Sequence, residues 1–237
     1  ENGNSITSAG KIYAYDDDGN LLWERADPLP ASYNRMGYTL DMGHGRIVAG
    51  TPYPSSNQGR AYVFDYSGNY LGILTADTND ATIDPDLRFG RAVAVGTNYI
   101  AVATDYARTS AYFDGSNNAL SNNMGLCYFY NKDTLQFVEK KYFPSEYYGP
   151  PTYGSGATYF GSQIAFGDGK FVIVAKEWSY HGLQRIGGAF VYNENTLTLD
   201  ATIKLPVDIA EGGEMLGQHD MIIAGGRIVL SQPNDNF

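Results

Sequence analysis

The chain has 237 residues, of which 43% are hydrophobic and 18% charged, a composition typical of a globular domain with few surface charges. Its net charge of -10 argues against binding to the phosphate backbone of nucleic acids. The single cysteine, Cys127, cannot form an internal disulfide, and no Cys/His group has metal-ligand spacing, so we expect no metal and no cofactor. The longest apolar stretch, near 92–103, is too short to cross a bilayer.

In chain order, the first predicted element is an aromatic-rich strand over 10–16, followed by the hairpin signal Asp18-Gly19-Asn20. A unit then begins at Met36-Gly37 with an alternating strand, a tight glycine turn and a second apolar strand over 46–50. Another aromatic-rich strand follows over 59–65. The apolar-glycine unit returns at 89–103, 160–175 and 216–230, and the aromatic-rich strand returns at 125–131 and 188–193. Such recurrence indicates a repeat architecture.

Each repeat is predicted to be four short strands in an up-and-down meander, which is a blade of a β-propeller. The repeat glycines Gly37, Gly90, Gly161 and Gly217 are separated by 53, 71 and 56 residues, and counting from Gly217 through the C-terminus to Gly37 gives 57. The sequence thus predicts one all-β domain over 1–237, a propeller of four blades with four antiparallel strands each. The blades are expected at 36–75, 89–143, 160–205, and 216–237 together with 10–25, the last closed by strands from both termini. The alternative is a fragment of a larger propeller.

The pairs Phe89-Gly90 and Phe160-Gly161 and the ending Ala49-Gly50-Thr51-Pro52 resemble the FG-GAP repeat of integrin α-type β-propellers. Met36-Gly37 and Leu216-Gly217 are weaker versions of the same pair. The resemblance implies a propeller over nearly the whole chain. Members of that family carry acidic calcium loops between the first two strands of several blades. The corresponding turns here are too short and too poor in carboxylates to supply six or more oxygen ligands, so we expect no calcium site.

The predicted connections differ between the two ends of the blades. Turns within hairpins are a few residues long, whereas the connections at the other end include 75–88, 104–124, 142–159 and 176–187. Loops longer than about 12 residues are usually functional or disordered. These are rich in aromatic residues with Asn, Ser and Gly, a composition suited to adaptable recognition and to sugars. The predicted partner-binding residues are Tyr106, Tyr112, Phe113, Tyr147, Tyr148, Tyr153, Trp178, Tyr180 and His181. The alternative is that these side chains pack on one another to hold the loops.

Catalytic candidates are few. His44 is expected in a solvated turn, and His219 and Asp220 are adjacent in a predicted strand, so their side chains point to opposite faces. Asp41 and Asp220 fall in predicted first strands, but the neighbouring repeats have apolar residues there. The sequence therefore predicts no catalytic residue and a protein that is not an enzyme.

These features favour a non-catalytic recognition or structural module of an extracellular assembly, either a phage virion appendage or a bacterial surface protein, acting in host recognition or cell adhesion. The expected partner is a glycan or a protein bound at the long-loop face, with neither nucleic-acid binding nor membrane insertion. The lack of Asn-x-Ser/Thr sequons fits such a source, and the start at Glu1 suggests a longer polypeptide or an oligomer. Two alternatives stay open: a propeller glycoside hydrolase or lyase acting at the channel mouth, and a spacer with loops buried against sister subunits.

Overall fold

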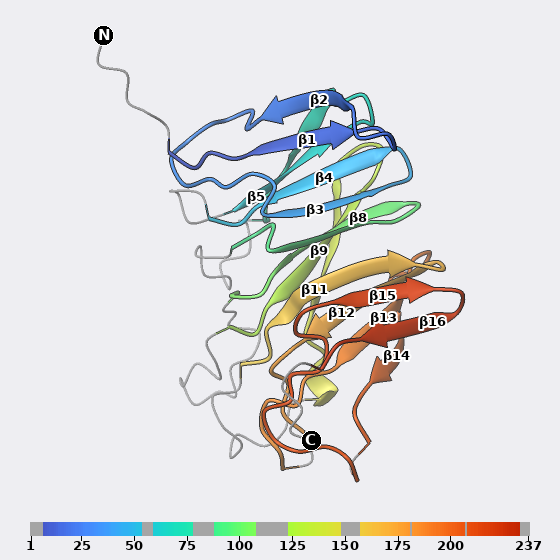
Figure 1. Ribbon diagram of the computed structural model, residues 1–237. Coiled ribbons are helices and arrows are strands. Elements are labelled where there is room, and N and C mark those ends of the chain that lie inside the picture. Colours follow the sequence, from blue (N-terminus) through green and yellow to red (C-terminus); the bar gives the residue numbers. More distant parts are fainter. Residues whose placement is uncertain are drawn as a thin grey trace.

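The computed structural model describes residues 7–53, 59–77, 88–107, 123–147, 157–180, 182–206 and 208–232 (Figure 1). Over these residues the protein is all-β, and its strands pair only in antiparallel sheets apart from isolated bridges. A single 3-10 turn, η2 (Ser145–Tyr147), interrupts the described strands and loops. No helix in this part of the chain is long and apolar enough to cross a membrane.

Three sheets each contain four strands in sequential order. The first contains β3 (Thr39–Gly43), β4 (Arg46–Thr51), β5 (Arg60–Phe64) and β6 (Tyr70–Leu74). The second contains β7 (Ala92–Val95), β8 (Tyr99–Thr104), β9 (Leu126–Asn131) and β10 (Phe137–Tyr142). The third contains β11 (Phe160–Gly167), β12 (Lys170–Ala175), β13 (Ala189–Asn193) and β14 (Leu199–Ile203). The predicted up-and-down order of four antiparallel strands is confirmed in these three sheets.

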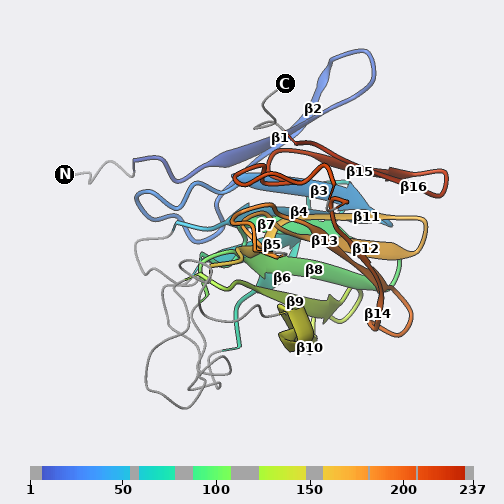
Figure 2. The ribbon, with the colours of Figure 1, turned by 90° about the horizontal axis from the view of Figure 1, so that it is seen from below.

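The remaining strands form two separate half-sheets: β1 (Lys11–Tyr15) with β2 (Leu21–Ala26), and β15 (Met221–Ala224) with β16 (Arg227–Leu230). The predicted sheet that joins strands from both termini is therefore wrong for this structure, because β16 does not pair with β1. The half-sheets overlap in the view of Figure 2 but lie well apart in Figure 1. Each packs on a different complete sheet: Ile12 of β1 packs among first-sheet residues, and β15 packs beside β11.

Successive sheets are joined by the same glycine contact, repeated four times. A glycine with positive φ lies just before or at the start of an aromatic-rich strand and abuts the backbone of the next repeat. The pairs are Gly10 with Met36, Gly59 with Phe89, Gly125 with Phe160, and Gly187 with Leu216. A Cβ on any of these glycines would overlap the facing backbone, so only glycine fits. In the third sheet the joint residue is Gly187 and not its neighbour Gly188, at which the repeat pattern places the start of the strand.

The core lies between sheets and not within one. In β7, Val93 and Val95 pack toward the first sheet, whereas Ala94 packs toward the third. The small side chains on that side leave room for large ones, and Phe160 and Phe171 of the third sheet fill it. The first strands pack in the order β3, β7, β11 and β15. The contacts between sheets therefore run through their first strands.

The positions that correspond to this buried core are exposed on the outward faces of the first sheet and of the last half-sheet. Leu40 and Met42 of β3 correspond to Val93 and Val95, yet they are 54% and 65% exposed. On the last half-sheet, Ile222 and Val229 are 61% and 60% exposed. These apolar faces are uncovered because no described strand packs on them.

Candidate functional site

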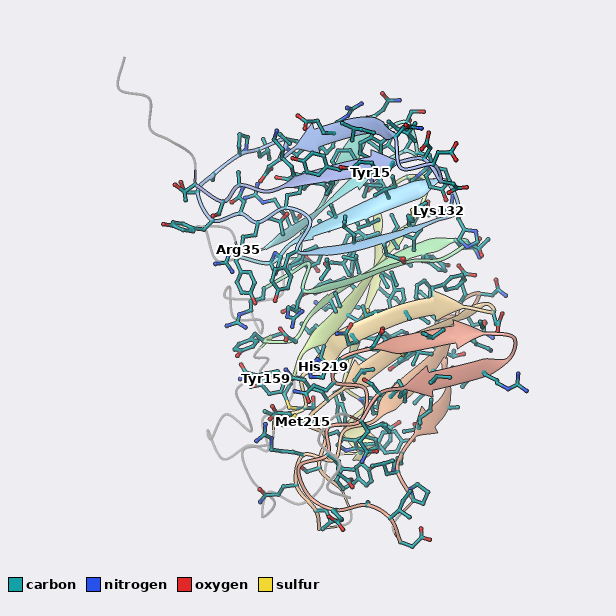
Figure 3. The ribbon with its side chains drawn as sticks, in the orientation of Figure 1. Tyr15, Arg35, Lys132, Tyr159, Met215 and His219 are labelled. Carbon is teal, nitrogen blue, oxygen red and sulfur yellow. The ribbon has the colours of Figure 1, made fainter. Side chains whose placement is uncertain are left out.

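The antiparallel order gives every sheet a turn end, where hairpins close in tight turns, and a loop end, where the longer connections leave. Four residues with left-handed backbones mark the loop end: Arg35, Arg88, Tyr159 and Met215, with φ between 44° and 55°. Each immediately precedes the residue that a joint glycine faces: Met36, Phe89, Phe160 or Leu216. Non-glycine residues hold such conformations only where the surrounding structure imposes them, and four others, His44, Leu135, Asp168 and Leu197, lie in turns at the turn end. Figure 3 shows Arg35, Tyr159 and Met215 on one side of the ribbon and Lys132 on the other.

Tyrosines that follow β4 and β8 stack against these arginines. The guanidinium carbon of Arg88 lies 3.4 Å from the ring centroid of Tyr106 and 5.4 Å from that of Tyr53. The guanidinium carbon of Arg35 lies 5.3 Å from the ring centroid of Tyr53. Arg88 belongs to the second repeat. It therefore bridges the two tyrosines that follow the second strands, β4 and β8, of two successive sheets. Arginine over an aromatic face is a favourable electrostatic contact.

The stacking continues into the third sheet. The rings of Tyr106 and Tyr159 meet edge to face with their centroids 5.5 Å apart, and the ammonium of Lys176 lies 4.7 Å from the centroid of Tyr159. We call this set the arginine–tyrosine row; its members are Arg35, Tyr53, Arg88, Tyr106, Tyr159 and Lys176. Arg35 is exposed, and the others are half-buried.

A buried carboxylate lies beside the row. Asp105 directly follows β8, is 1% exposed, and forms an ion pair with Arg91, whose Nε is 3.5 Å from its Oδ2. Burial raises the pKa of Asp105, and the nearby charges of Arg91, Lys176 and Arg88 only partly offset this effect. Its Oδ1 has no hydrogen-bond partner among the described residues. The acid is thus buried beside three cations, Arg91, Lys176 and Arg88.

The structure places the predicted contact residues in two settings. Tyr106 belongs to the row, whereas Tyr147, Trp178 and Tyr180 form a separate packed cluster. Trp178 is only 2% exposed, and its Nε1 donates a hydrogen bond to the carbonyl oxygen of Tyr147. The ammonium of Lys204 lies 4.6 Å and 4.7 Å from the ring centroids of Tyr147 and Trp178. Packing accounts for the Trp178 ring, which is not open to a partner.

Five other predicted contact residues lie outside the described residues: Tyr112, Phe113, Tyr148, Tyr153 and His181. Conversely, sequence reasoning missed the other members of the row: Arg35, Tyr53, Arg88, Tyr159 and Lys176. The signal was present, because Arg35 and Arg88 stand directly before the Met-Gly and Phe-Gly pairs of successive repeats. Only the structure brings Arg35 against Tyr53 of its own repeat and Arg88 between Tyr53 and Tyr106 of two repeats.

The catalytic candidates stay apart from one another. His44 is exposed at the turn end, with its ring edge against that of Phe166 at 5.7 Å. The carboxylate of Asp41 accepts a hydrogen bond from the backbone N–H of Val95 at 2.7 Å, and burial raises its pKa. Asp41 thus links β3 to β7. His219 and Asp220 are both exposed at the loop end.

Within the described ranges, no three His, Cys, Asp or Glu side chains gather as a potential metal site. A scan against protein-family models and a search of curated proteins found no match for this sequence.

Proposed function

We propose that the sheets are consecutive blades of a β-propeller and that the protein is a non-catalytic recognition module of an extracellular assembly. We further propose that it binds a glycan through the loop end, as part of a phage virion appendage or a bacterial surface protein. The propeller is supported by the four repeated glycine joints and by the row of first strands that carries the contacts between sheets. Its resemblance to FG-GAP repeats belongs to the same proposal.

The observation that carries the function is the arginine–tyrosine row. Tyrosine and arginine are the residue types that recognition surfaces favour, since a rigid ring supplies contact area at low entropic cost and a guanidinium supplies directed donors. Here Arg88 has a left-handed backbone next to a joint and contacts the tyrosines that follow β4 and β8. A surface held in place before binding loses less free energy on binding.

An enzyme would need two or more carboxylates converging near one bond. Asp41 is engaged with the backbone of Val95 in a contact between sheets, which favours a structural role for it. Asp220 is the remaining channel candidate. Its backbone N–H bonds to Ser231 and its carboxylate accepts from the N–H of Met221.

A glycan array combined with a hydrolysis assay tests the proposal. We expect binding to a defined subset of glycans with no release of product over hours. Product release that disappears in an Asp220→Asn variant would favour the hydrolase or lyase instead. If no glycan binds but a surface protein binds saturably, the partner is a protein and not a glycan.

A further inference from the structure

Arg35 and Arg88 of the row have no acidic partner among the described residues. The chain has 26 Asp and Glu against 16 Lys and Arg, and three described arginines, Arg46, Arg91 and Arg185, form ion pairs with described carboxylates. At the turn end, Arg46 pairs with Asp133 and Lys170 with Asp200. Arg35 and Arg88, by contrast, form neither an ion pair nor a side-chain hydrogen bond with any described residue.

Among the described residues, no side chain forms a hydrogen bond or an ion pair with the guanidinium of Arg35 or Arg88. When Arg88 lies over the face of Tyr106, its five N–H donors remain in the guanidinium plane, perpendicular to the stacking direction. This planar fork matches the two oxygens of a carboxylate, and the resulting bidentate hydrogen bonds are charge-assisted. The tyrosine holds the fork in one orientation, so less rotamer freedom is lost when an anion binds.

The neighbouring groups favour an anion as well. Lys176 lies at the other end of the row, and Arg91 lies over the ring of Tyr38 at 5.2 Å. The carboxylate among them, Asp105, is buried and already paired with Arg91, so it does not occupy the outer edges of Arg35 and Arg88. The tyrosine rings beside these donors offer apolar surface for the C–H face of a sugar.

We propose that the arginine–tyrosine row binds the carboxylate groups of an acidic polysaccharide, with Arg35 and Arg88 as the carboxylate donors. This inference rests on the proposed glycan recognition and names its ligand class. The repeat places equivalent arginines at successive sheets, which suits a polymer with a carboxylate on successive sugar units. The row's tyrosines contact the sugar rings between those charges.

The test is titration calorimetry with oligogalacturonate, alginate and hyaluronan, each paired with its carboxyl-reduced form, and with heparin as a sulfate-rich probe. We expect at least one carboxylate polymer to bind and its reduced form to bind about tenfold or more weakly, with affinity that falls as salt rises. The double variant Arg35→Gln/Arg88→Gln should lose about tenfold or more in affinity. Arg88→Lys keeps the charge but not the planar fork, so its affinity should lie between those of the wild type and the double variant.

Arg227→Gln is the control for a positive charge lost away from the row, because Arg227 is exposed at the turn end; it removes one charge, whereas the double variant removes two. This control should bind like the wild type, and thermal melts should show all four proteins folded. Equal binding of the reduced polymer, or wild-type affinity in the double variant, would overturn the carboxylate site while leaving glycan recognition intact. Binding to heparin alone would mean that the row recognises sulfate groups and not carboxylates. If no glycan of either kind binds on this panel or on the array, both proposals fail.

Discussion

The two ends of the sheets are built from different kinds of contact. At the turn end two hairpins close on their own polar groups: Asp16 accepts hydrogen bonds from the N–H and side chain of Asn20, and Asp65 does the same with Asn69. These contacts span four residues and need no neighbouring sheet. They follow directly from the local turn chemistry of Asp and Asn.

At the loop end the contacts cross from one sheet to the next. The joint glycines abut the backbone of the following repeat, and Arg88 stacks between tyrosines that follow two sheets. The turn end thus combines local turns with side-chain contacts between sheets, such as Arg46 with Asp133, whereas at the loop end the backbones of successive repeats abut and the candidate surface lies there. A substitution at the loop end should therefore disturb more of the molecule than an equivalent one at the turn end.

The largest difference is expected between two glycines with nearly the same backbone. Gly125 has φ +81° and faces the carbonyl of Phe160, whereas Gly19 has φ +84° and an added Cβ there would meet nothing within 4 Å. Gly125→Ala should lower the free energy of unfolding by about 2–4 kcal/mol, since strain and overlap add. Gly19→Ala should cost about 1 kcal/mol from backbone strain alone.

Urea unfolding of both variants measures the two losses. Comparable losses at Gly125 and Gly19 would contradict the idea that the joints fix the sheets. Such a result would mean that the facing backbone moves aside at little cost.

A smaller effect, of opposite sign at the two ends, is expected in the pH dependence of stability. At the loop end, burial raises the pKa of Asp105 above its unfolded value, so its charge destabilises the fold at neutral pH. That cost is relieved as pH falls through the folded pKa, because the folded state takes up the proton first. Asp105→Asn should therefore melt higher than the wild type at pH 7, and the difference should vanish in acid.

At the turn end the direction is reversed. Hydrogen bonds from the side chain and N–H of Asn69 lower the pKa of Asp65, so its charged form stabilises the fold above the unfolded pKa, near 4. That contribution is lost as pH falls through the folded pKa. Asp65→Asn should melt lower than the wild type at pH 7 and approach it in acid. Melting curves from pH 7 to pH 3 compare the two variants, and differences of the same sign would refute this contrast.

The local features were predictable from sequence, and the non-local ones were not. The apolar strand Arg46–Thr51 and the turn after Phe64 follow from the local run of apolar residues and from turn residues, which act within a few positions. Whether β16 meets β1 depends on the angle between sheets, which arises from packing such as Ala94 against the third sheet. A match in repeat spacing carries no information about that angle.

The candidate surface was predictable only in part. Tyr106 was expected from the aromatic composition of its loop, and so was Trp178, which the structure buries. Composition does not distinguish an aromatic side chain that packs inward from one that faces a partner. Arg35 and Arg88 escaped because their role depends on rings supplied from elsewhere in the chain, which no local pattern reveals.

Hydrogen–deuterium exchange of the wild-type protein, with and without the acidic polysaccharide that binds it most tightly, tests the central claim directly. We expect slower exchange at the loop end, over 33–38, 51–53, 88–91 and 104–107, where the row is built. Exchange at the turn end, over 16–20 and 65–69, should be unchanged. Protection centred on the turn end, or no protection at the row while the ligand is bound, would contradict the account.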